Sequence, residues 1–169
     1  MHESVMKWVK QVTRKLDLSG KTVLEVGSYN INGSVRELFA GAKEYIGIDS
    51  RSGPGVDYVM NAHDLAFAVG YSEVVTTGLF DIVVSTEMLE HDPQFWLSLA
   101  EMGRVLKPNG LLIVTARGNG FPLHDFPGDY YRFMPESFPE LFKLAGCEVI
   151  EVREDPEAPG VFGIGRKMQ

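Results

Sequence analysis

Two acidic residues and two glycines are placed where an α/β protein binds a nucleotide. Glu25 lies near the end of the apolar run 21–26, Gly27 follows it, and Gly33 precedes the next helix-forming segment. Asp49 ends the next apolar run. In folds of this type a glycine turn lets the backbone approach the ligand, and an acidic residue after the second strand accepts hydrogen bonds from ribose hydroxyls. The pattern therefore predicts a site for a ligand that contains adenosine.

The histidines are the candidate acid–base groups. His91 follows Glu87 and Glu90, and His124 is followed by Asp125 in the long loop after the apolar run 111–115. Imidazole titrates near neutral pH, so either histidine can take a proton from a substrate hydroxyl. We take His124 and His91 as candidate catalytic residues. The alternative for His91 is a packed histidine at the start of a helix.

Alternating strands and helices are expected to position these residues. Apolar runs predict strands at 21–26, 45–48, 56–60, 80–84, 111–115, 148–152 and 161–164. Apolar periodicity and turn residues predict a first helix that ends near residue 20, and further helices in 34–40, 65–78, 93–106 and 135–146. Asp92 is expected to cap the fourth of these helices, and the last two strands are expected to pair antiparallel. The fold class is therefore α/β, with a mainly parallel, doubly wound sheet covered by helices on both faces and a ligand at the carboxyl ends of the strands.

The composition limits the classes of protein to which the chain can belong. Its 169 residues are enough for one domain, expected to span 1–169. The net charge of -7 disfavours a nucleic acid partner. Cys147 is the only cysteine, and no run approaches the roughly 20 apolar residues that a membrane helix needs. We therefore expect a soluble, cytoplasmic protein without a membrane partner.

Several motifs together resemble the class I S-adenosylmethionine-dependent methyltransferases, in particular their small bacterial members. The similar segments are Val23-Leu24-Glu25-Val26-Gly27-Ser28, Asn61-Ala62-His63-Asp64-Leu65, Phe80-Asp81-Ile82-Val83-Val84-Ser85, Glu87-Met88-Leu89-Glu90-His91, Arg104-Val105-Leu106-Lys107-Pro108-Asn109-Gly110 and Asp129-Tyr130-Tyr131-Arg132-Phe133. The resemblance implies a Rossmann-like, seven-stranded sheet whose C-terminal strand is reversed. It divides the chain into an N-terminal helix (1–20), a half that binds the methyl donor (21–116) and a loop, helix and strand pair on the acceptor side (117–169).

The resemblance also implies a set of donor-binding residues. These are Glu25, Gly27, Ser28, Gly33, Asp49, Asn61, Ala62 and Ser85. The chain departs from the family in one motif, because Tyr29 and Ile31 stand where the family usually repeats glycine. Asn30 and Asn32 tolerate left-handed backbone, so the loop can still turn sharply.

The cluster of Glu87, Glu90, His91 and His124 also resembles a metal signature. Its Glu-x-x-Glu-His spacing is similar to that of metal-dependent RNA 2′-O-methyltransferases and of certain quinone-pathway O-methyltransferases. That resemblance implies Mg²⁺ or Mn²⁺ on oxygen-rich ligands. The same letters occur in many metal-free members, and the acidic chain disfavours RNA. A functional metal is therefore not expected, and no residue is assigned as a ligand.

The expected function is transfer of a methyl group from S-adenosylmethionine, with S-adenosylhomocysteine as product, to an unidentified small molecule at oxygen or nitrogen. Two alternatives remain open: a nicotinamide-dependent oxidoreductase on the same type of sheet, and a non-catalytic partner subunit that binds S-adenosylmethionine. The G-x-G-x-x-G fingerprint of the oxidoreductase is absent from the sequence. The protein is expected to be a monomer or a homodimer.

Overall fold

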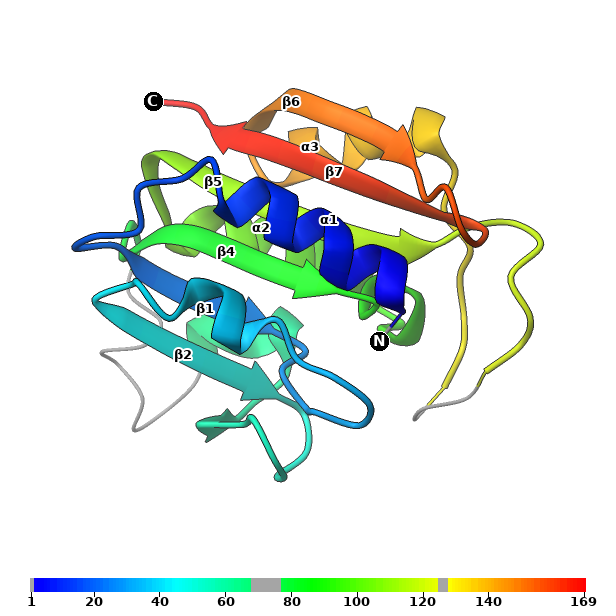
Figure 1. Ribbon diagram of the computed structural model, residues 1–169, viewed down its shortest axis with the longest axis horizontal. Helices are drawn as coiled ribbons and strands as arrows, with labels where there is room; N and C mark the ends of the chain where they lie inside the picture. The colour runs from blue at the N-terminus through cyan, green and yellow to red at the C-terminus, as the bar shows by residue number, and fades with distance from the viewer. Residues whose placement is uncertain (1, 68–76, 125–127) are drawn as a thin grey trace.

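The computed structural model describes residues 2–67, 77–124 and 128–169. Within these residues one sheet has the strand order β3-β2-β1-β4-β5-β7-β6 (Figure 1). The strands are β1 (Thr22–Val26), β2 (Glu44–Asp49), β3 (Tyr58–Val59), β4 (Phe80–Thr86), β5 (Leu106–Arg117), β6 (Cys147–Glu154) and β7 (Gly160–Lys167). β1 to β5 pair in parallel, whereas β7 runs antiparallel to both β5 and β6. The predicted fold class, including the reversed last strand, is confirmed.

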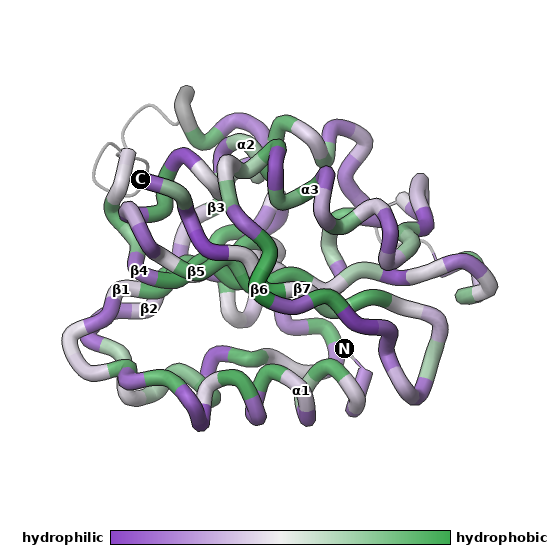
Figure 2. Tube along the Cα trace, turned by 90° about the horizontal axis from the view of Figure 1, so that it is seen from above, coloured by the Kyte–Doolittle hydropathy of each residue, from purple (hydrophilic) through white to green (hydrophobic). Residues whose placement is uncertain are grey.

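Helices lie on both faces of the sheet, as predicted (Figure 2). The α-helices are α1 (Glu3–Thr13), α2 (Phe95–Val105) and α3 (Phe138–Leu144), and the short 3₁₀ segments are η1 (Arg36–Phe39), η2 (Ala62–Phe67), η3 (Leu89–His91) and η4 (Pro135–Ser137). α1 lies on one face, and α2 and α3 lie on the other. None of the helices in the described ranges is both long and apolar enough to cross a membrane.

The apolar stripe of α1 covers one face of the sheet. Val5, Trp8 and Val9 are buried against side chains of the central strands. The indole of Trp8 stacks on Phe162 of β7 with ring centroids 4.9 Å apart. Burying each such side chain contributes about 1.5–3 kcal/mol, so this stripe fixes α1 on the sheet.

Two glycines of β7 let α3 approach the opposite face closely. A Cβ atom at Gly163 would lie 2.5 Å from Cδ1 of Phe138, and one at Gly165 would lie 2.5 Å from Cδ1 of Phe142. Both phenylalanines are fully buried in the hydrophobic core between the sheet and the helices α2 and α3. The absence of side chains at these two positions therefore creates the space that α3 fills.

Four local expectations differ from the structure. The first helix, expected to end near residue 20, ends at Thr13. The predicted helix 34–40 is only the 3₁₀ segment η1, because a stretch this short between glycines cannot offset the cost of helix nucleation. Leu106, expected on a helix, begins β5, where it pairs with Phe80. Asp92 accepts a hydrogen bond from the backbone N–H of Gln94 at 2.8 Å, but α2 begins only at Phe95. The predicted helix in 65–78 overlaps η2, and residues 68–76 of it lie outside the described residues.

Candidate functional site

A cavity of about 520 Å³ opens at the carboxyl ends of β1, β2 and β4. Its size falls within the range of small-molecule and cofactor sites. Of the residues predicted as site residues, those that line it are Glu25, Gly27, Ser28, Gly33, Asp49, Asn61, Ala62, His91 and His124. The parallel strands bring these residues together because their carboxyl ends meet at one edge of the sheet.

Glu25 is a buried carboxyl group in the wall of the cavity. Its side chain is 2% exposed, and Oε2 accepts a 2.8 Å hydrogen bond from the hydroxyl of Tyr45. Burial raises the pKa of Glu25 to about 7, although the bond from Tyr45 lowers it. The same burial, together with the charge of Glu25, raises the pKa of Tyr45, which therefore stays protonated and donates.

The turn after β1 places backbone and a free hydroxyl at the cavity. Gly27 has a φ of +84°, and its N–H donates to the carbonyl of Ile48 at 2.9 Å. A Cβ atom at Gly27 would lie 2.7 Å from Cγ of Met88, so glycine is needed here for conformation and for space. The Ser28 hydroxyl is buried and has no hydrogen-bond partner among the described residues. Such a group needs a ligand or water to satisfy it.

The loop after this turn closes on itself. Gly33 has a φ of +136°, and its N–H donates to Oδ1 of Asn30 at 2.9 Å. Neither Asn30 nor Asn32 adopts the left-handed backbone that was expected of them, and Asn30 closes the turn instead by accepting this bond. The loop keeps Gly33 at the cavity without the usual glycine repeat.

Asp49 and Asn61 line the cavity from the ends of β2 and β3. Asp49 accepts hydrogen bonds from the N–H of Tyr29 at 3.2 Å and from the N–H of Arg51 at 3.1 Å. These bonds fix the carboxylate at the rim of the cavity. Asn61 donates from Nδ2 to Asp64 at 3.2 Å, which leaves its carbonyl oxygen as an acceptor.

Ser85 is the predicted donor-binding residue that the structure does not bring to the cavity. Its side chain is fully buried in β4, and the cavity is lined instead by its neighbour Thr86. Successive side chains of a strand point to opposite faces, so a shift by one residue moves the hydroxyl from the core to the site. The Thr86 hydroxyl is also buried without a partner among the described residues.

His91 and His124 lie against each other, although they are far apart in the sequence. Their ring centroids are 4.7 Å apart with an interplanar angle of 77°. Nδ1 of His91 contacts the carbonyl oxygen of Gly128, and Nδ1 of His124 lies 3.2 Å from Oδ2 of Asp129. Burial lowers the pKa of His91, and the neighbouring His124 lowers it further. Asp125, the other acidic group predicted beside His124, lies outside the described residues.

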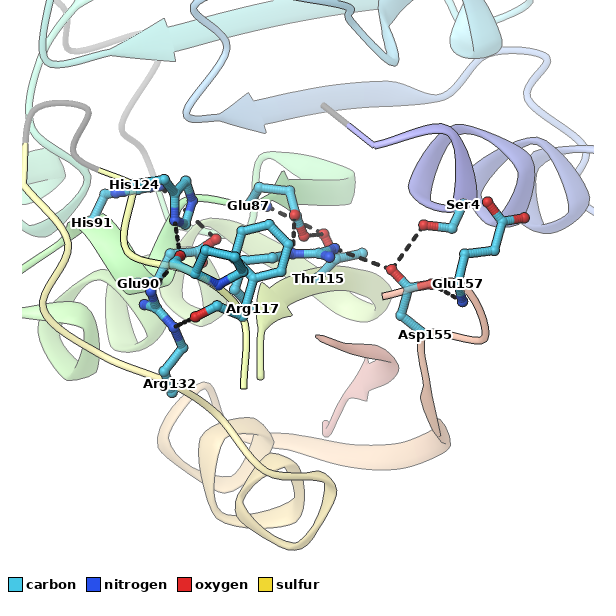
Figure 3. A network of polar contacts seen from close by, with 12 residues as sticks. Ser4, Glu87, Glu90, His91, Thr115, Arg117, His124, Arg132, Asp155 and Glu157 are labelled. Atoms are coloured by element: carbon cyan, nitrogen blue, oxygen red, sulfur yellow. Dashed lines mark hydrogen bonds and ion pairs between the residues drawn. The ribbon is translucent and has the colours of Figure 1, made fainter. Parts of the chain in front are cut away.

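Glu87 is held by a buried arginine that the sequence analysis did not identify. The carboxylate of Glu87 forms an ion pair with Nε of Arg117 and accepts a 2.8 Å hydrogen bond from the hydroxyl of Thr115 (Figure 3). Arg117 is fully buried, and its Nη2 also lies 3.3 Å from Oδ2 of Asp155. The hydroxyl of Ser4 donates to Asp155 at 2.8 Å. This network links α1 to the wall of the cavity.

Glu90 is buried directly behind the two histidines. Neither of its carboxyl oxygens has a hydrogen-bond partner among the described residues, and its side chain is fully buried. Oε1 lies 4.0 Å from Nε2 of His91. Burial raises the pKa of Glu90, and the nearby charge of Glu87 raises it further.

The cavity wall near His91 and His124 includes one residue whose role the sequence left undecided, Tyr130, and one that the sequence analysis did not identify, His2. Tyr130 lines the cavity, whereas Tyr131 and Arg132 do not, and Arg132 donates from Nη2 to Asp129 at 2.6 Å. His2 lines the cavity from the start of α1, where its ring packs on Phe121 with centroids 5.1 Å apart. Nothing in the sequence indicates the approach of His2, because only the packing of α1 on the sheet brings it to this edge.

Solved structures with this fold include several methyltransferases. The 1,6-didemethyltoxoflavin-N1-methyltransferase of Burkholderia thailandensis, solved with 1,6-didemethyltoxoflavin and S-adenosylhomocysteine bound, is similar with a TM-score of 0.75 and 15% identity over 99% of this chain and 80% of that chain. A candidate S-adenosylmethionine-dependent methyltransferase of Listeria monocytogenes has a TM-score of 0.70 and 16% identity over 99% of both chains. The [4+2]-cyclase SpnF has a TM-score of 0.72 and 17% identity over 97% of this chain and 80% of that chain. At such identities the likeness shows the fold alone. No curated protein sequence matches the chain.

The family is shown by the sequence itself. A family model described as a methyltransferase domain matches residues 24–114. The matched segment covers more than half of the chain and contains the buried carboxyl of Glu25, the glycine turn and Asp49. The match decides against a nicotinamide-dependent oxidoreductase. The chain therefore belongs to the methyltransferase domain family and is a class I S-adenosylmethionine-dependent methyltransferase.

Proposed function

We propose that this protein methylates a small molecule at an oxygen or nitrogen atom, with the donor bound along β1, β2 and β4 and the acceptor bound beside His91 and His124. The observation that carries the proposal is that one cavity joins both groups of residues. A donor and an acceptor held in one enclosed space react as if in a single molecule, which is the main contribution an enzyme makes to a direct displacement.

The donor half of the cavity fits S-adenosylmethionine, which when bound supplies an activated methyl group on a sulfonium. We assign Asp49 to the ribose hydroxyls and the backbone at Gly27 and Ser28, with Glu25, to the methionine part. The unpartnered hydroxyl of Ser28 supports this assignment because it is a buried group that lacks a partner among the described residues. Asn61 and Ala62 lie where they can contact the adenine.

The acceptor half explains why a small molecule is the preferred substrate. The walls here are His91, His124, Tyr130 and the ion-paired Glu87. The chain's charge of -7 opposes the approach of a polyanion such as RNA. We assign His91 and His124 as the residues that act on the proton which an acceptor hydroxyl or amine loses on methylation.

Calorimetry with S-adenosylmethionine, S-adenosylhomocysteine and NADH tests the donor assignment. We expect both sulfur compounds to bind and NADH not to bind. Asp49→Ala should weaken donor binding by about 1–3 kcal/mol, because the two ribose hydroxyls of the bound donor lose their hydrogen-bond acceptor. Asp17→Ala is the matched control, since Asp17 also accepts a backbone N–H, from Ser19 at 3.0 Å, but does not line the cavity. Equal donor affinity in the two variants would contradict the assignment.

A labelling experiment tests the acceptor class. The protein is incubated with tritium-labelled S-adenosylmethionine and a cell extract, and the products are separated into small molecules, proteins and nucleic acids. We expect label in the small-molecule fraction. Label confined to protein or nucleic acid would overturn the proposed acceptor class. Donor binding without label in any fraction would instead favour the non-catalytic partner subunit.

A further inference from the structure

The buried carboxyl group of Glu90 needs an explanation that the donor site does not provide. A fully buried carboxyl group whose two oxygens accept no hydrogen bond lowers the stability of the fold. In folded proteins such groups usually bind an ion or a water molecule, or they are protonated. Both oxygens of Glu90 lack a hydrogen bond to the described residues, and Nε2 of His91 lies 4.0 Å from Oε1. The question is therefore what lies between Glu90 and the histidines.

The hydrogen bonds of the two histidines determine which ring nitrogen of each has a free lone pair for an ion. A carbonyl oxygen can only accept, so Nδ1 of His91, in contact with the Gly128 carbonyl, carries the hydrogen. Nδ1 of His124 lies 3.2 Å from both the Pro122 carbonyl and the Asp129 carboxylate, which are also acceptors. The lone pair of each neutral ring is therefore on Nε2. Histidines that bind metals show this arrangement, with the other nitrogen donating to a carbonyl or carboxylate.

The three side chains converge on one point at the acceptor end of the cavity. One ligand atom from each of Glu90, His91 and His124 lies within 4.8 Å of the other two (Figure 3). Shifts of less than about 1 Å bring all three atoms to bonding distance of a common ion, since Zn–N and Zn–O bonds measure about 2.0–2.2 Å. Resting on the proposed function, we propose that Glu90, His91 and His124 bind a divalent transition-metal ion, of the Zn²⁺ type, that activates the acceptor.

The structure changes the ligand set that the sequence motif suggests. Glu87 is not free to coordinate, because its carboxylate is paired with Arg117 and bonded by Thr115. The remaining set has two imidazoles and one carboxylate, the composition of catalytic zinc sites with an open position, whereas Mg²⁺ prefers oxygen ligands. The two histidines line the cavity, so the open position faces the acceptor.

With such an ion bound, His91 and His124 would act on the acceptor's proton as metal ligands and would not take up the proton themselves. An acceptor hydroxyl bound to the ion at the open position would become more acidic and would lose its proton to water more readily. An electron pair of its oxygen then forms the new bond to the methyl carbon while the pair of the breaking carbon–sulfur bond stays on sulfur. The products are the methylated acceptor, neutral S-adenosylhomocysteine and the released proton, so atoms and charge balance.

Metal titration of chelator-treated protein tests the site directly. Zn²⁺ is titrated by calorimetry and Co²⁺ by its visible absorption, and we expect one equivalent to bind with the spectrum of a site that has nitrogen ligands. Glu90→Gln and His124→Ala should each lower the affinity at least about tenfold. His124 lies in a loop, so its variant is expected to fold even if Glu90→Gln does not, and circular dichroism checks both.

Two control variants separate the proposed ligands from their neighbours. Glu87→Gln tests the motif's other carboxylate, and His63→Gln removes a cavity histidine that pairs with Asp92 instead. Both should retain metal affinity. The absence of stoichiometric binding, or equal affinity in the ligand variants and the controls, would overturn the inference. Donor binding and small-molecule methylation that survive chelation would overturn it while leaving the proposed function intact, whereas failure of donor binding would remove the proposed function itself.

Discussion

The hydroxyl of Tyr45 on β2 donates a 2.8 Å hydrogen bond to the carboxyl of Glu25 on the neighbouring strand β1. Glu25 lines the cavity, and its side chain is almost fully buried. Burial raises the pKa of Glu25 from 4.5 to about 7. Near neutral pH the group is therefore divided between its two protonation states, and its ionisation is coupled to folding.

Replacing Glu25 with glutamine should reduce the pH dependence of stability. Because the folded-state pKa is raised, the unfolded chain ionises first, and the free energy of unfolding falls as the pH rises from 4.5 to about 7. Glu25→Gln removes this loss, so its stability should change less over that window. Urea denaturation at a series of pH values measures the effect. Tyr45→Phe, which removes a bond to the charged form, should extend the fall to higher pH, and identical profiles for all three proteins would contradict the prediction.

Gly27→Ala should weaken donor binding as well as stability. The left-handed backbone at φ +84° strains any alanine, and the new Cβ atom would overlap Met88 at the cavity wall. Gly20→Ala is the matched control, because Gly20 has a φ of +72° but no atom within 4 Å of its added Cβ. Both variants should lose about 1–2 kcal/mol of stability from backbone strain. Only Gly27→Ala should also lose affinity for S-adenosylhomocysteine in calorimetry, and an equal affinity in both would show that the turn does not shape the donor site.

Arg117→Met should destabilise the protein by about 3–5 kcal/mol, since it leaves one fully buried and one largely buried carboxylate without their cation. Those carboxylates belong to Glu87 and Asp155. Lys7→Met is the control, because Lys7 forms its ion pairs with Glu3 and Glu157 at the surface. Exposed pairs of this kind contribute at most about 1 kcal/mol. Chemical denaturation measures the free energy of unfolding of both variants. Similar losses of stability would show that the buried ion pairs of Arg117 contribute no more than the surface ion pairs of Lys7.

Asp81→Asn should remove an acid-sensitive contribution to stability. Burial alone would raise the pKa of Asp81, but hydrogen bonds from Lys107 at 2.7 Å and from the N–H of Thr22 at 3.0 Å lower it from 3.8 to about 2. The carboxylate therefore stabilises the fold above pH 3.8, and this contribution is lost as the pH falls through about 2. The variant should be about 1–3 kcal/mol less stable at neutral pH and should lose less stability on acidification. Acid titration followed by circular dichroism measures the difference, and a parallel loss in both proteins would contradict it.

Much of the donor half could be predicted from the sequence because its signals are local. Apolar runs mark the strands, a glycine after the first strand marks the turn, and an acidic residue marks the end of the second. Parallel strands then bring Glu25, Gly27 and Asp49 to one edge whatever the details of packing. The antiparallel C-terminal pair was also predictable, since two strand-forming runs follow each other across a short loop.

The remaining relationships depend on packing between distant segments, and only the tertiary structure decided them. Ser85 and Thr86 differ in the sequence by one step, yet the pleat of β4 buries the first in the core and turns the second to the cavity. Arg117 lies beyond the predicted strand 111–115, but in the structure it ends β5, where the approach of Glu87 and Asp155 makes it a fully buried cation. The sequence by itself determined that Glu25, Gly27 and Asp49 reach the carboxyl edge of the sheet. Which residues find partners there, and which stay unpaired as Glu90 does among the described residues, depends on side-chain burial and pairing that no local pattern encodes.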